Sequence, residues 1–576
     1  MNLATTIKLI ILSVFISCTQ TKPTNEESTS LPTNPLFGVW SGLLFQTQSP
    51  YDSLILRPKS SPQEALLYKN GKAASYPLVQ KNKHFGFKGK GGLRFDATLA
   101  KGKSSLLGLI TNNLWVQSLD FRQRDNQWVA KIVKPEIIDT DYQVYLAFYE
   151  DNLGRLQTRI QSNKENRRLH FTIDSTFIEG NNIRFSISNK RFGISAKHIP
   201  AQNLLILTYK NPGGKRAITL KKLRPDETLG YRPRIPKQAY TYQVPKVPDT
   251  AWQTASLEEV GISPTMLELM KVMNSGKYDH IHSVIVTKNN KLVFEEYFHG
   301  YHREYLHDIR SAFKSIASLL VGKTIAKDST LRVDNPLLDY YPQYKIPEKS
   351  KQKITLHHAL TMSTGLKLES EDDMQRKNPD WVKYKLNLPL EHEPGQKYQY
   401  SSGGMNLLSG VIQKSQSGYV PLFLYEQILQ PLQIDKFQMR TSPMARAYLA
   451  GDFFLRPIDL AKFGQLVLNK GRWNHQQVIP AKWIETAIMP HIKGSWPKNS
   501  DYGYLWRLLE RKVGGKKMKT IEAWGNGGQF LIIIPEVNMT VTFTGGNYNL
   551  FPEMENKPFE ILNQYILPAV NLNTRK

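Results

Sequence analysis

The sequence predicts a multi-domain protein, with all-β modules in its N-terminal half and a mixed α/β domain in its C-terminal half. The chain has 576 residues, more than one hydrophobic core usually supports, so we expect about two to four domains. Short runs of alternating apolar residues, separated by turn residues, fill positions 37–223 and are typical of β-strands. After a proline-rich stretch at 225–250, the pattern alternates between helices and strands.

The first 18 residues indicate an export signal. Lys8 precedes a short apolar run at 9–16, which ends at a small residue and is too short to span a membrane. Cys18 follows and is the sole cysteine, which excludes an intramolecular disulfide and a multi-cysteine metal site. This arrangement resembles the lipobox of bacterial lipoproteins, with Phe15 where leucine is usual. It implies a lipid on Cys18 and anchoring to a membrane of the bacterial cell envelope, periplasmic or outer. Plain secretion is the alternative.

The next segments predict a tether and two β modules. Residues 19–36 are rich in Thr, Ser, Asn, Pro and Glu, which predicts a flexible tether. An apolar run at 105–111 is echoed at 203–209, so we predict two tandem β-sandwich or small-barrel modules, 37–124 and 125–224. One larger β domain is the alternative. No cluster in this half suggests catalysis, so we interpret it as a spacer or as a module that binds a carbohydrate or a partner, such as a cell-wall polymer.

A basic charge balance raises the question of nucleic acid. The formal net charge is +27, from 76 basic and 49 acidic residues. The lysines are scattered through every segment, and no basic helix interleaved with stacking aromatics appears. We therefore expect a generally basic surface, suited to anionic envelope polymers, and no nucleic-acid partner.

The C-terminal domain, 251–576, begins after a predicted extended linker at 225–250, which contains five prolines. Ser263 and Pro264 are typical of the N-cap and first turn of a helix, predicted over 263–271. Two strands around an Asn-Asn-Lys hairpin are predicted over 283–298. The segment that follows, at 311–322, predicts a buried helix.

Ser311 and Lys314 open that predicted helix and are the candidate nucleophile and base. A serine hydroxyl is a poor nucleophile until a base takes its proton. Residues three apart stand on the same face of a helix, and burial lowers the pKa of a lysine. Downstream, a turn at 394–403 delivers Tyr400 to the head of an apolar helix, where a phenol near an ammonium could carry protons.

Together these segments resemble the serine β-lactamase and penicillin-binding protein family, particularly its class C-like esterases, amidases and D-peptidases. The resemblance covers roughly residue 251 to the C-terminus. Its signatures are Ser311-x-x-Lys314, a segment at 354–366 similar to the family's "ITL-x-x-LL-x-x-TSGL", Tyr400-Ser401-Ser402 at the place of Tyr-x-Asn, a late helix within 454–471, and a glycine-rich turn at 523–530 leading into a strand at the place of the Lys-Thr-Gly strand.

The resemblance implies an antiparallel sheet flanked by helices, a helical subdomain and a cleft between them. It implies an acyl-enzyme on Ser311, with Lys314 and Tyr400 sharing the acid and base work and no cofactor or metal. The oxyanion hole would use the backbone N–H of Ser311 and one from the strand edge at 524–528. Residues for substrate binding and the oxyanion site are then Ser402, Gly525, Asn526 and Gly527.

Two departures bear on the substrate. Ser402 replaces the usual asparagine, which binds the substrate amide and the lysine. The third motif has no Lys or His at its cationic position, which is Ala523 or Asn526 depending on register. We therefore expect an uncharged small-molecule or peptide ester or amide. A D-Ala-D-Ala carboxypeptidase or β-lactamase, and an inactive cell-wall or partner-binding protein, are the alternatives.

An acidic cluster follows the 354–366 segment. It consists of Glu369, Glu371, Asp372 and Asp373. We interpret it as a solvated loop at the cleft rim, with a deacylating base or a site that attracts cationic substrates as the alternatives.

Overall fold

The computed structural model describes most of the chain. The described residues are 34–43, 53–58, 63–81, 83–90, 92–99, 106–112, 114–132, 143–150, 154–162, 173–187, 193–211, 214–224, 240–246, 252–278, 280–298, 301–371, 373–416, 418–497, 499–548 and 552–572. The predicted signal with Cys18, most of the predicted tether and most of the predicted linker lie outside these residues.

The C-terminal domain is built on a nine-stranded sheet, ordered β18-β20-β19-β31-β30-β29-β28-β27-β26. Neighbouring strands run antiparallel, except that β18 and β20 are parallel. The strands are β18 (Gln253–Thr254), β19 (Ile281–Lys288), β20 (Lys291–Tyr297), β26 (Ile492–Ser495), β27 (Ser500–Tyr502), β28 (Arg507–Val513), β29 (Lys516–Gly525), β30 (Gln529–Ile534) and β31 (Met539–Gly545). The predicted hairpin is confirmed, because Asn289 and Asn290 join β19 to β20 with φ of 53° and 62°, as a two-residue turn requires.

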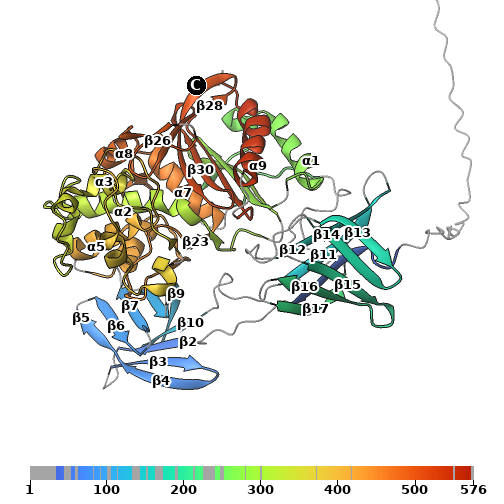
Figure 1. Ribbon diagram of the computed structural model, residues 1–576, viewed down its shortest axis with the longest axis horizontal. Helices are drawn as coiled ribbons and strands as arrows, with labels where there is room; N and C mark the ends of the chain where they lie inside the picture. The colour runs from blue at the N-terminus through green and yellow to red at the C-terminus, as the bar shows by residue number, and fades with distance from the viewer. Residues whose placement is uncertain are drawn as a thin grey trace, which may run out of the picture.

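Helices cover both faces of this sheet (Figure 1). They are α1 (Glu268–Asn274), α2 (Phe313–Lys327), α3 (Leu356–Leu360), α4 (Trp381–Asn387), α5 (Gly404–Gln416), α6 (Val420–Leu424), α7 (Pro457–Leu468), α8 (Ala481–Ala487) and α9 (Glu553–Ile561). Alternate residues of β30 point to opposite faces. Leu531 and Ile533 join the core of α2, α5, α7 and α8, whereas Phe530, Ile532 and Ile534 join the core of α1 and α9. This two-sided burial explains the unbroken apolar run of β30.

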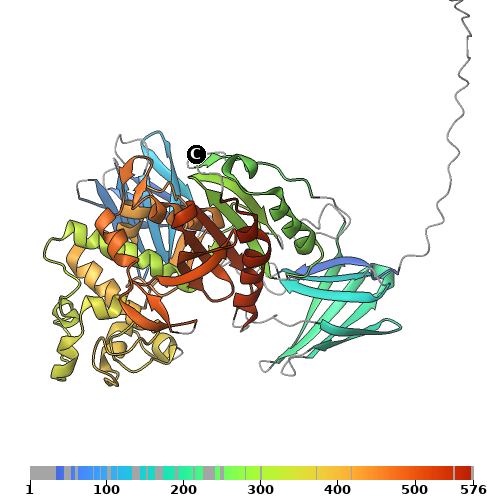
Figure 2. The same cartoon turned by 90° about the horizontal axis from the view of Figure 1, so that it is seen from above.

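Two curled sheets make up the N-terminal half. One has the order β4-β3-β2-β10-β9-β8-β7-β6-β5, and its end strands β4 and β5 are consecutive in the chain, so it curls round a core that includes Leu54 and Phe95. The other has the order β12-β11-β1-β17-β16-β15-β14-β13, and its edges meet where Thr176 Oγ donates to Thr158 Oγ at 2.8 Å. Figures 1 and 2 show this second sheet projecting from one side of the molecule.

The strands of these two sheets are short. Those of the first are β2 (Ser53–Arg57), β3 (Glu64–Lys69), β4 (Lys72–Pro77), β5 (Val79–Lys81), β6 (His84–Lys88), β7 (Arg94–Leu99), β8 (Leu106–Asn112), β9 (Trp115–Arg124) and β10 (Gln127–Lys131). Those of the second are β1 (Gly38–Leu43), β11 (Gln143–Glu150), β12 (Leu156–Ser162), β13 (Ile173–Glu179), β14 (Asn182–Ile187), β15 (Gly193–Ile199), β16 (Leu204–Asn211) and β17 (Gly214–Lys222).

These sheets differ from the predicted modules 37–124 and 125–224 at both ends of the first module. β1 pairs with β11 and β17, so it belongs to the second sheet. β10 pairs with β2 and β9, so it belongs to the first. The segment 53–131 is therefore inserted between the first two strands of the other sheet. Alternation along a strand shows that it has one buried face but not which distant strand it pairs with.

The inserted sheet is continued by strands of the C-terminal domain. β9 pairs with β22 (Gln438–Arg440), β22 pairs with β23 (Phe453–Leu455), and β23 pairs with β21 (His307–Asp308). Leu109 of β8 and Val116 of β9 lie in the same core as α2. The inserted sheet and the C-terminal domain are thus joined by a continuous backbone ladder.

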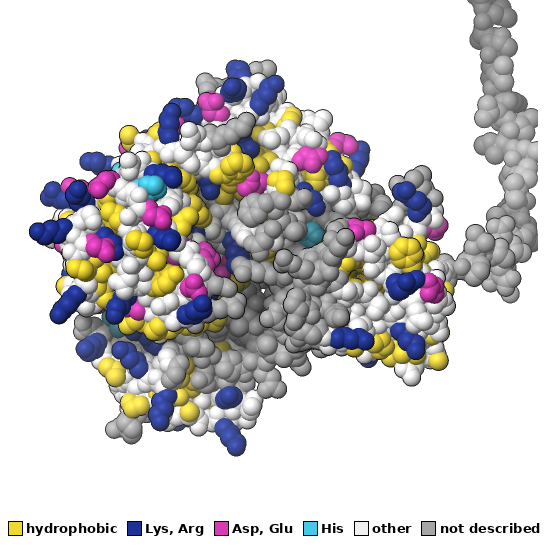
Figure 3. Space-filling view, in the orientation of Figure 1, with side chains coloured by type: hydrophobic (Ala, Val, Ile, Leu, Met, Phe, Trp, Pro, Cys, Tyr) yellow, Lys and Arg dark blue, Asp and Glu magenta, His cyan; other side chains and the backbone are white. Residues whose placement is uncertain are grey.

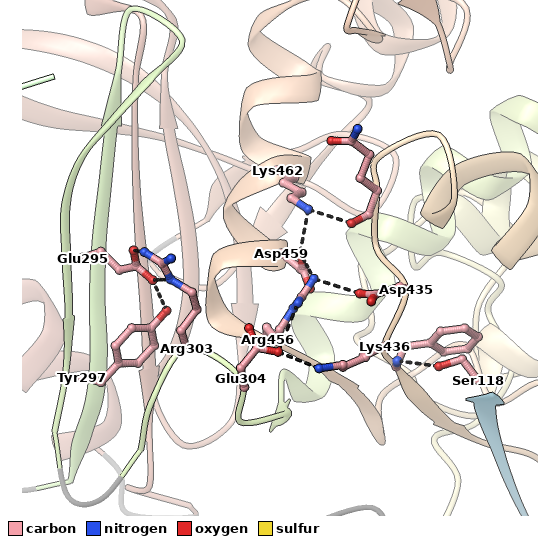
Figure 4. A network of polar contacts seen from close by, with 12 residues as sticks. Ser118, Glu295, Tyr297, Arg303, Glu304, Asp435, Lys436, Arg456, Asp459 and Lys462 are labelled. Carbon is pink, nitrogen blue, oxygen red and sulfur yellow. Dashed lines mark hydrogen bonds and ion pairs between the residues drawn. The ribbon is translucent and has the colours of Figure 1, made fainter. Parts of the chain in front are cut away.

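Polar contacts brace this junction (Figure 4). Ser118 Oγ accepts a hydrogen bond from the backbone N–H of Phe437 at 3.2 Å. The neighbouring Lys436 pairs with Glu304 at 2.7 Å, and Asp435 pairs with Arg456, the N-cap residue of α7, at 3.1 Å. These contacts hold the segment before β22 between β9 and α7.

Lysine and arginine side chains are dispersed over the face seen in Figure 3. This dispersal is what the scattered lysines of the sequence predict. Among the described residues, the structure contains no helix that is both long and apolar enough to cross a membrane.

Candidate active site

Ser311 and Lys314 lie together at the start of α2. Ser311 belongs to the 3₁₀ turn η5 (Arg310–Ala312), and Lys314 lies in the first turn of the helix. Lys314 Nζ donates a hydrogen bond to Ser311 Oγ at 2.8 Å. The lysine is 2% exposed, because its neighbours Phe313 and Ile316 carry α2 into the core. The predicted proximity of the serine and the lysine is therefore present.

Lys314 has a second partner that the sequence did not indicate. Its Nζ donates to the backbone carbonyl of Ala450 at 2.7 Å. Close by, Asp452 pairs with Arg310 at 3.3 Å, and Asp308 pairs with Arg310 at 2.8 Å. Arg310 immediately precedes Ser311 and has a φ of 49°, a strained conformation for a residue with a side chain. Two carboxylates thus hold the strained residue that presents the serine.

Tyr400 faces Lys314 from the turn before α5. Lys314 Nζ lies 4.8 Å from the centroid of the Tyr400 ring. Burial alone would raise the pKa of the phenol, but the Lys314 ammonium, hydrogen bonding to Lys314 and Ser311, and the Arg507 guanidinium bring this pKa below its ordinary value. The structure therefore brings the three predicted side chains Ser311, Lys314 and Tyr400 together.

Ser402 lies in the same turn and is buried, but it does not hold the lysine. Besides the Tyr400 oxygen, the acceptors of the Lys314 ammonium among the described residues are Ser311 Oγ and the Ala450 carbonyl. The carbonyl thus takes the lysine-binding part of the role predicted for Ser402. A contact between Ser402 and a substrate amide stays a prediction.

The end of β29 forms a wall beside the serine. A Cβ on Gly525 would lie 2.3 Å from the carbonyl oxygen of Ile309 and 3.1 Å from Arg310 Cβ, so the missing side chain lets the strand approach the residues that precede Ser311. Asn526 follows and is half-buried. A Cβ on Gly527 would lie 2.4 Å from the Tyr548 ring, so packing explains this second glycine.

The residues of this site lie within a recognisable family segment. Residues 282–558 match the family model described as Beta-lactamase. This segment is a β-lactamase-family domain. The match includes Ser311, Lys314, Tyr400 and Gly525, and the antiparallel sheet flanked by helices is the fold that the resemblance implies.

Two curated relatives match about a quarter of the chain. Protein flp of Staphylococcus aureus (strain MW2) is 25% identical over 167 residues, which are 26% of this chain and 33% of that protein. The mitochondrial serine beta-lactamase-like protein LACTB of Mus musculus is 26% identical over 193 residues, 26% of this chain and 35% of that protein. The chain spans about a third of the length of the curated relatives it matches.

Solved structures show weaker likeness over about half of the chain. EstCE1, a hydrolase with promiscuous acyltransferase activity, has a TM-score of 0.43 at 14% identity and covers 52% of this chain and 97% of its own. The octameric penicillin-binding protein homologue from Pyrococcus abyssi has a TM-score of 0.41 at 18% identity and covers 52% and 74%.

In the β-lactamase-family domain, a cationic side chain that the sequence patterns did not indicate lies close to the site. Arg507 opens β28, and its guanidinium lies 5.9 Å from the centroid of the Tyr400 ring and 4.8 Å from that of Trp524. It donates to Ser495 Oγ at 2.6 Å and to the Trp496 carbonyl, and no carboxylate of the described residues pairs with it. The third motif lies on β29, whereas this arginine lies on the neighbouring strand β28.

The acidic cluster of this β-lactamase-family domain differs from the predicted solvated loop. Glu369 is 4% exposed and pairs with Lys385 of α4 at 2.8 Å. Glu371 is exposed, and Asp372 lies outside the described residues. The partner of Glu369 is sixteen positions away on α4, so the local sequence does not indicate that this carboxylate is buried.

Proposed function

We propose that this protein is a serine hydrolase that forms an acyl-enzyme on Ser311 and cleaves an ester or amide bond. One observation carries the proposal: the Lys314 ammonium lies 2.8 Å from Ser311 Oγ, opposite a tyrosine whose pKa is lowered. A pKa below that of free tyrosine makes the Tyr400 phenolate accessible as a base.

In the proposed reaction, the Tyr400 phenolate takes the Ser311 proton as Oγ attacks the substrate carbonyl. The Lys314 ammonium stabilises the oxygen of Tyr400 and Oγ of Ser311. The backbone N–H groups of Ser311 and Asn526 are the proposed donors to the oxyanion. The tetrahedral intermediate collapses, and the leaving alcohol or amine receives the proton from Tyr400. Water then attacks the acyl-enzyme by the same route, releasing the acid and the free serine.

The test is the intact mass of the purified protein after treatment with a fluorophosphonate probe. We expect one adduct on the wild type and none on Ser311→Ala, because only an activated serine reacts with such a probe. Adducts on both proteins would place the nucleophile elsewhere. No adduct on either would favour the rival interpretation, a non-catalytic protein that binds a cell-wall polymer or another partner.

Arg507 bears on the choice of substrate. An arginine without a carboxylate partner among the described residues could bind an anionic group next to the scissile bond. The segment 523–526, at the end of β29 beside the serine, has no cationic residue for this role. This observation favours the alternative of a D-Ala-D-Ala carboxypeptidase or β-lactamase more than the sequence did. Covalent labelling by a fluorescent penicillin would support that alternative.

The Arg507→Gln variant is expected to lose more activity towards an anionic substrate than towards a neutral one. A lost charge-assisted hydrogen bond costs about 1.5–3 kcal/mol, so kcat/KM for the p-nitrophenyl monoester of succinate should fall by about tenfold or more. The value for neutral p-nitrophenyl acetate should fall less, since that ester offers the arginine no anion and loses only the contribution of the guanidinium to the lowered pKa of Tyr400. Equal losses on both esters would contradict an anion-binding role.

The location of the protein is a separate proposal. The signal-like residues 1–18 support a lipid on Cys18 and anchoring in the bacterial cell envelope. Metabolic labelling with a fatty-acid analogue should mark the wild type and leave Cys18→Ser unlabelled. Label on neither protein would favour plain secretion.

A further inference from the structure

Glu369 and Lys385 form a buried ion pair beneath the turn that carries Tyr400. Their side chains are 4% and 0% exposed, and Lys385 Nζ lies 2.8 Å from Glu369 Oε2. Lys385 also donates to the carbonyl of Lys367 at 2.8 Å. Burial raises the pKa of Glu369, but the Lys385 ammonium and the Gly403 N–H more than offset this, so the pKa lies below its ordinary value. The carboxylate is therefore charged at neutral pH.

The carboxylate is bonded directly to the turn. Glu369 Oε2 accepts from Ser401 Oγ at 2.8 Å, and Oε1 accepts from the Gly403 N–H at 2.6 Å. Ser401 Oγ in turn accepts from the Gly404 N–H at 2.9 Å, at the N-terminus of α5. A Cβ on Gly403 would lie 2.8 Å from the Glu369 carboxyl carbon. The turn and the carboxylate thus fit each other closely.

Tyr400 is bracketed by this contact and a second one. On its N-terminal side, the Gln399 N–H donates to the Met362 carbonyl at 2.7 Å. On its C-terminal side, Ser401 is held by Glu369 and approaches Met362 Sδ at 3.5 Å. The tyrosine backbone therefore has fixed neighbours on both sides. None of these bracketing residues touches Ser311 or Lys314 through a hydrogen bond among the described residues.

We infer that Glu369 and Lys385 are positioning residues that hold Tyr400 against Lys314 and Ser311. This inference rests on the proposed function. A buried ion pair is a weak net source of stability, whereas losing one partner leaves an unpaired charge. The pair therefore suits a role in geometry, since a displacement of about 1 Å in a catalytic group can cost about 10²-fold in rate.

The experiment compares two changes that loosen the turn in different ways. Glu369→Gln with Lys385→Met removes both charges together, and Ser401→Ala removes one link to the turn while keeping the ion pair. Glu295→Gln is the matched control, since Glu295 lies on β20, is 3% exposed and pairs with Arg303. The readouts are Tm, the pH dependence of p-nitrophenyl acetate hydrolysis, and the ultraviolet titration of Tyr400, assigned by difference from Tyr400→Phe.

Both loosened variants are expected to titrate Tyr400 at higher pH than the wild type, since the phenol moves away from the Lys314 ammonium. Their kcat should fall by about tenfold to a hundredfold, with KM little changed. The control should have a lower Tm, but its pH dependence of hydrolysis and its Tyr400 titration should match those of the wild type. A lower Tm with an unshifted Tyr400 titration would overturn the inference and leave only a structural role.

The titration also separates the two proposals. It reports the surroundings of Tyr400 whether or not the protein turns over an ester. A wild type without a fluorophosphonate adduct, combined with a shifted titration in the variants, would reject the proposed function and keep the positioning role. An adduct on the wild type, combined with an unshifted titration in the variants, would keep the proposed function and reject the positioning role.

Discussion

Lys314→Met should lower kcat/KM for p-nitrophenyl acetate by about 10³-fold, within the range of about 10²–10⁴ that general acid–base groups supply. The substitution removes the hydrogen bond to Ser311 Oγ and the charge that lowers the pKa of Tyr400. The acid-side limb of the pH profile should therefore move up towards the ordinary range of tyrosine, because a base with a raised pKa is deprotonated only at higher pH.

Two controls accompany this prediction. Methionine nearly matches lysine in length and buries no charge, so the Tm should stay the same or rise. Tyr400→Phe should cost a similar factor, and the double variant should cost no more than either single one, because the two residues act as a unit. Additive losses in the double variant would show that the lysine and the tyrosine act in separate steps.

Gly525→Ala is expected to disrupt the site from the opposite wall. The new Cβ would lie 2.3 Å from the Ile309 carbonyl oxygen, and a backbone atom cannot rotate away as a side chain can. Overpacking of this kind costs about 1–3 kcal/mol. Relief requires β29 to separate from the residues before Ser311, so the fluorophosphonate labelling rate should fall by about 10²-fold.

Gly451→Ala is the matched control for this prediction. A Cβ there faces the same Arg310 backbone, but at 3.5 Å, which is ordinary van der Waals contact. Its labelling rate and Tm should stay close to the wild type. If the two variants have the same labelling rate and Tm, contact with the Arg310 segment is not the reason that position 525 requires glycine.

The sequence predicted those parts of the site that depend on spacing along one element. Ser311 and Lys314 are three apart on one helix, so their contact follows from helix geometry. The unbroken apolar run of β30 likewise follows from burial on both faces. Such features need no knowledge of distant partners.

Features that depend on distant pairing were not predicted. Ala450 contributes a backbone carbonyl, which leaves no mark on residue type. Arg507 stands near Tyr400 because β28 lies beside β29, and β1 joins the second curled sheet because of its pairing with β11. Each depends on the order of strands in a sheet, which local alternation does not determine.

The pairing of β9 with β22 has a consequence for dissecting the protein. A chain cut at the proline-rich linker would carry the whole family segment, yet it would leave β22 as an open edge with unpaired N–H and C=O groups. It would also uncover the core surface that Leu109 and Val116 cover. Exposed edges and apolar patches promote self-association. The shortest soluble fragment that carries the site should therefore include the inserted sheet, even though that sheet lies far from Ser311 in the sequence.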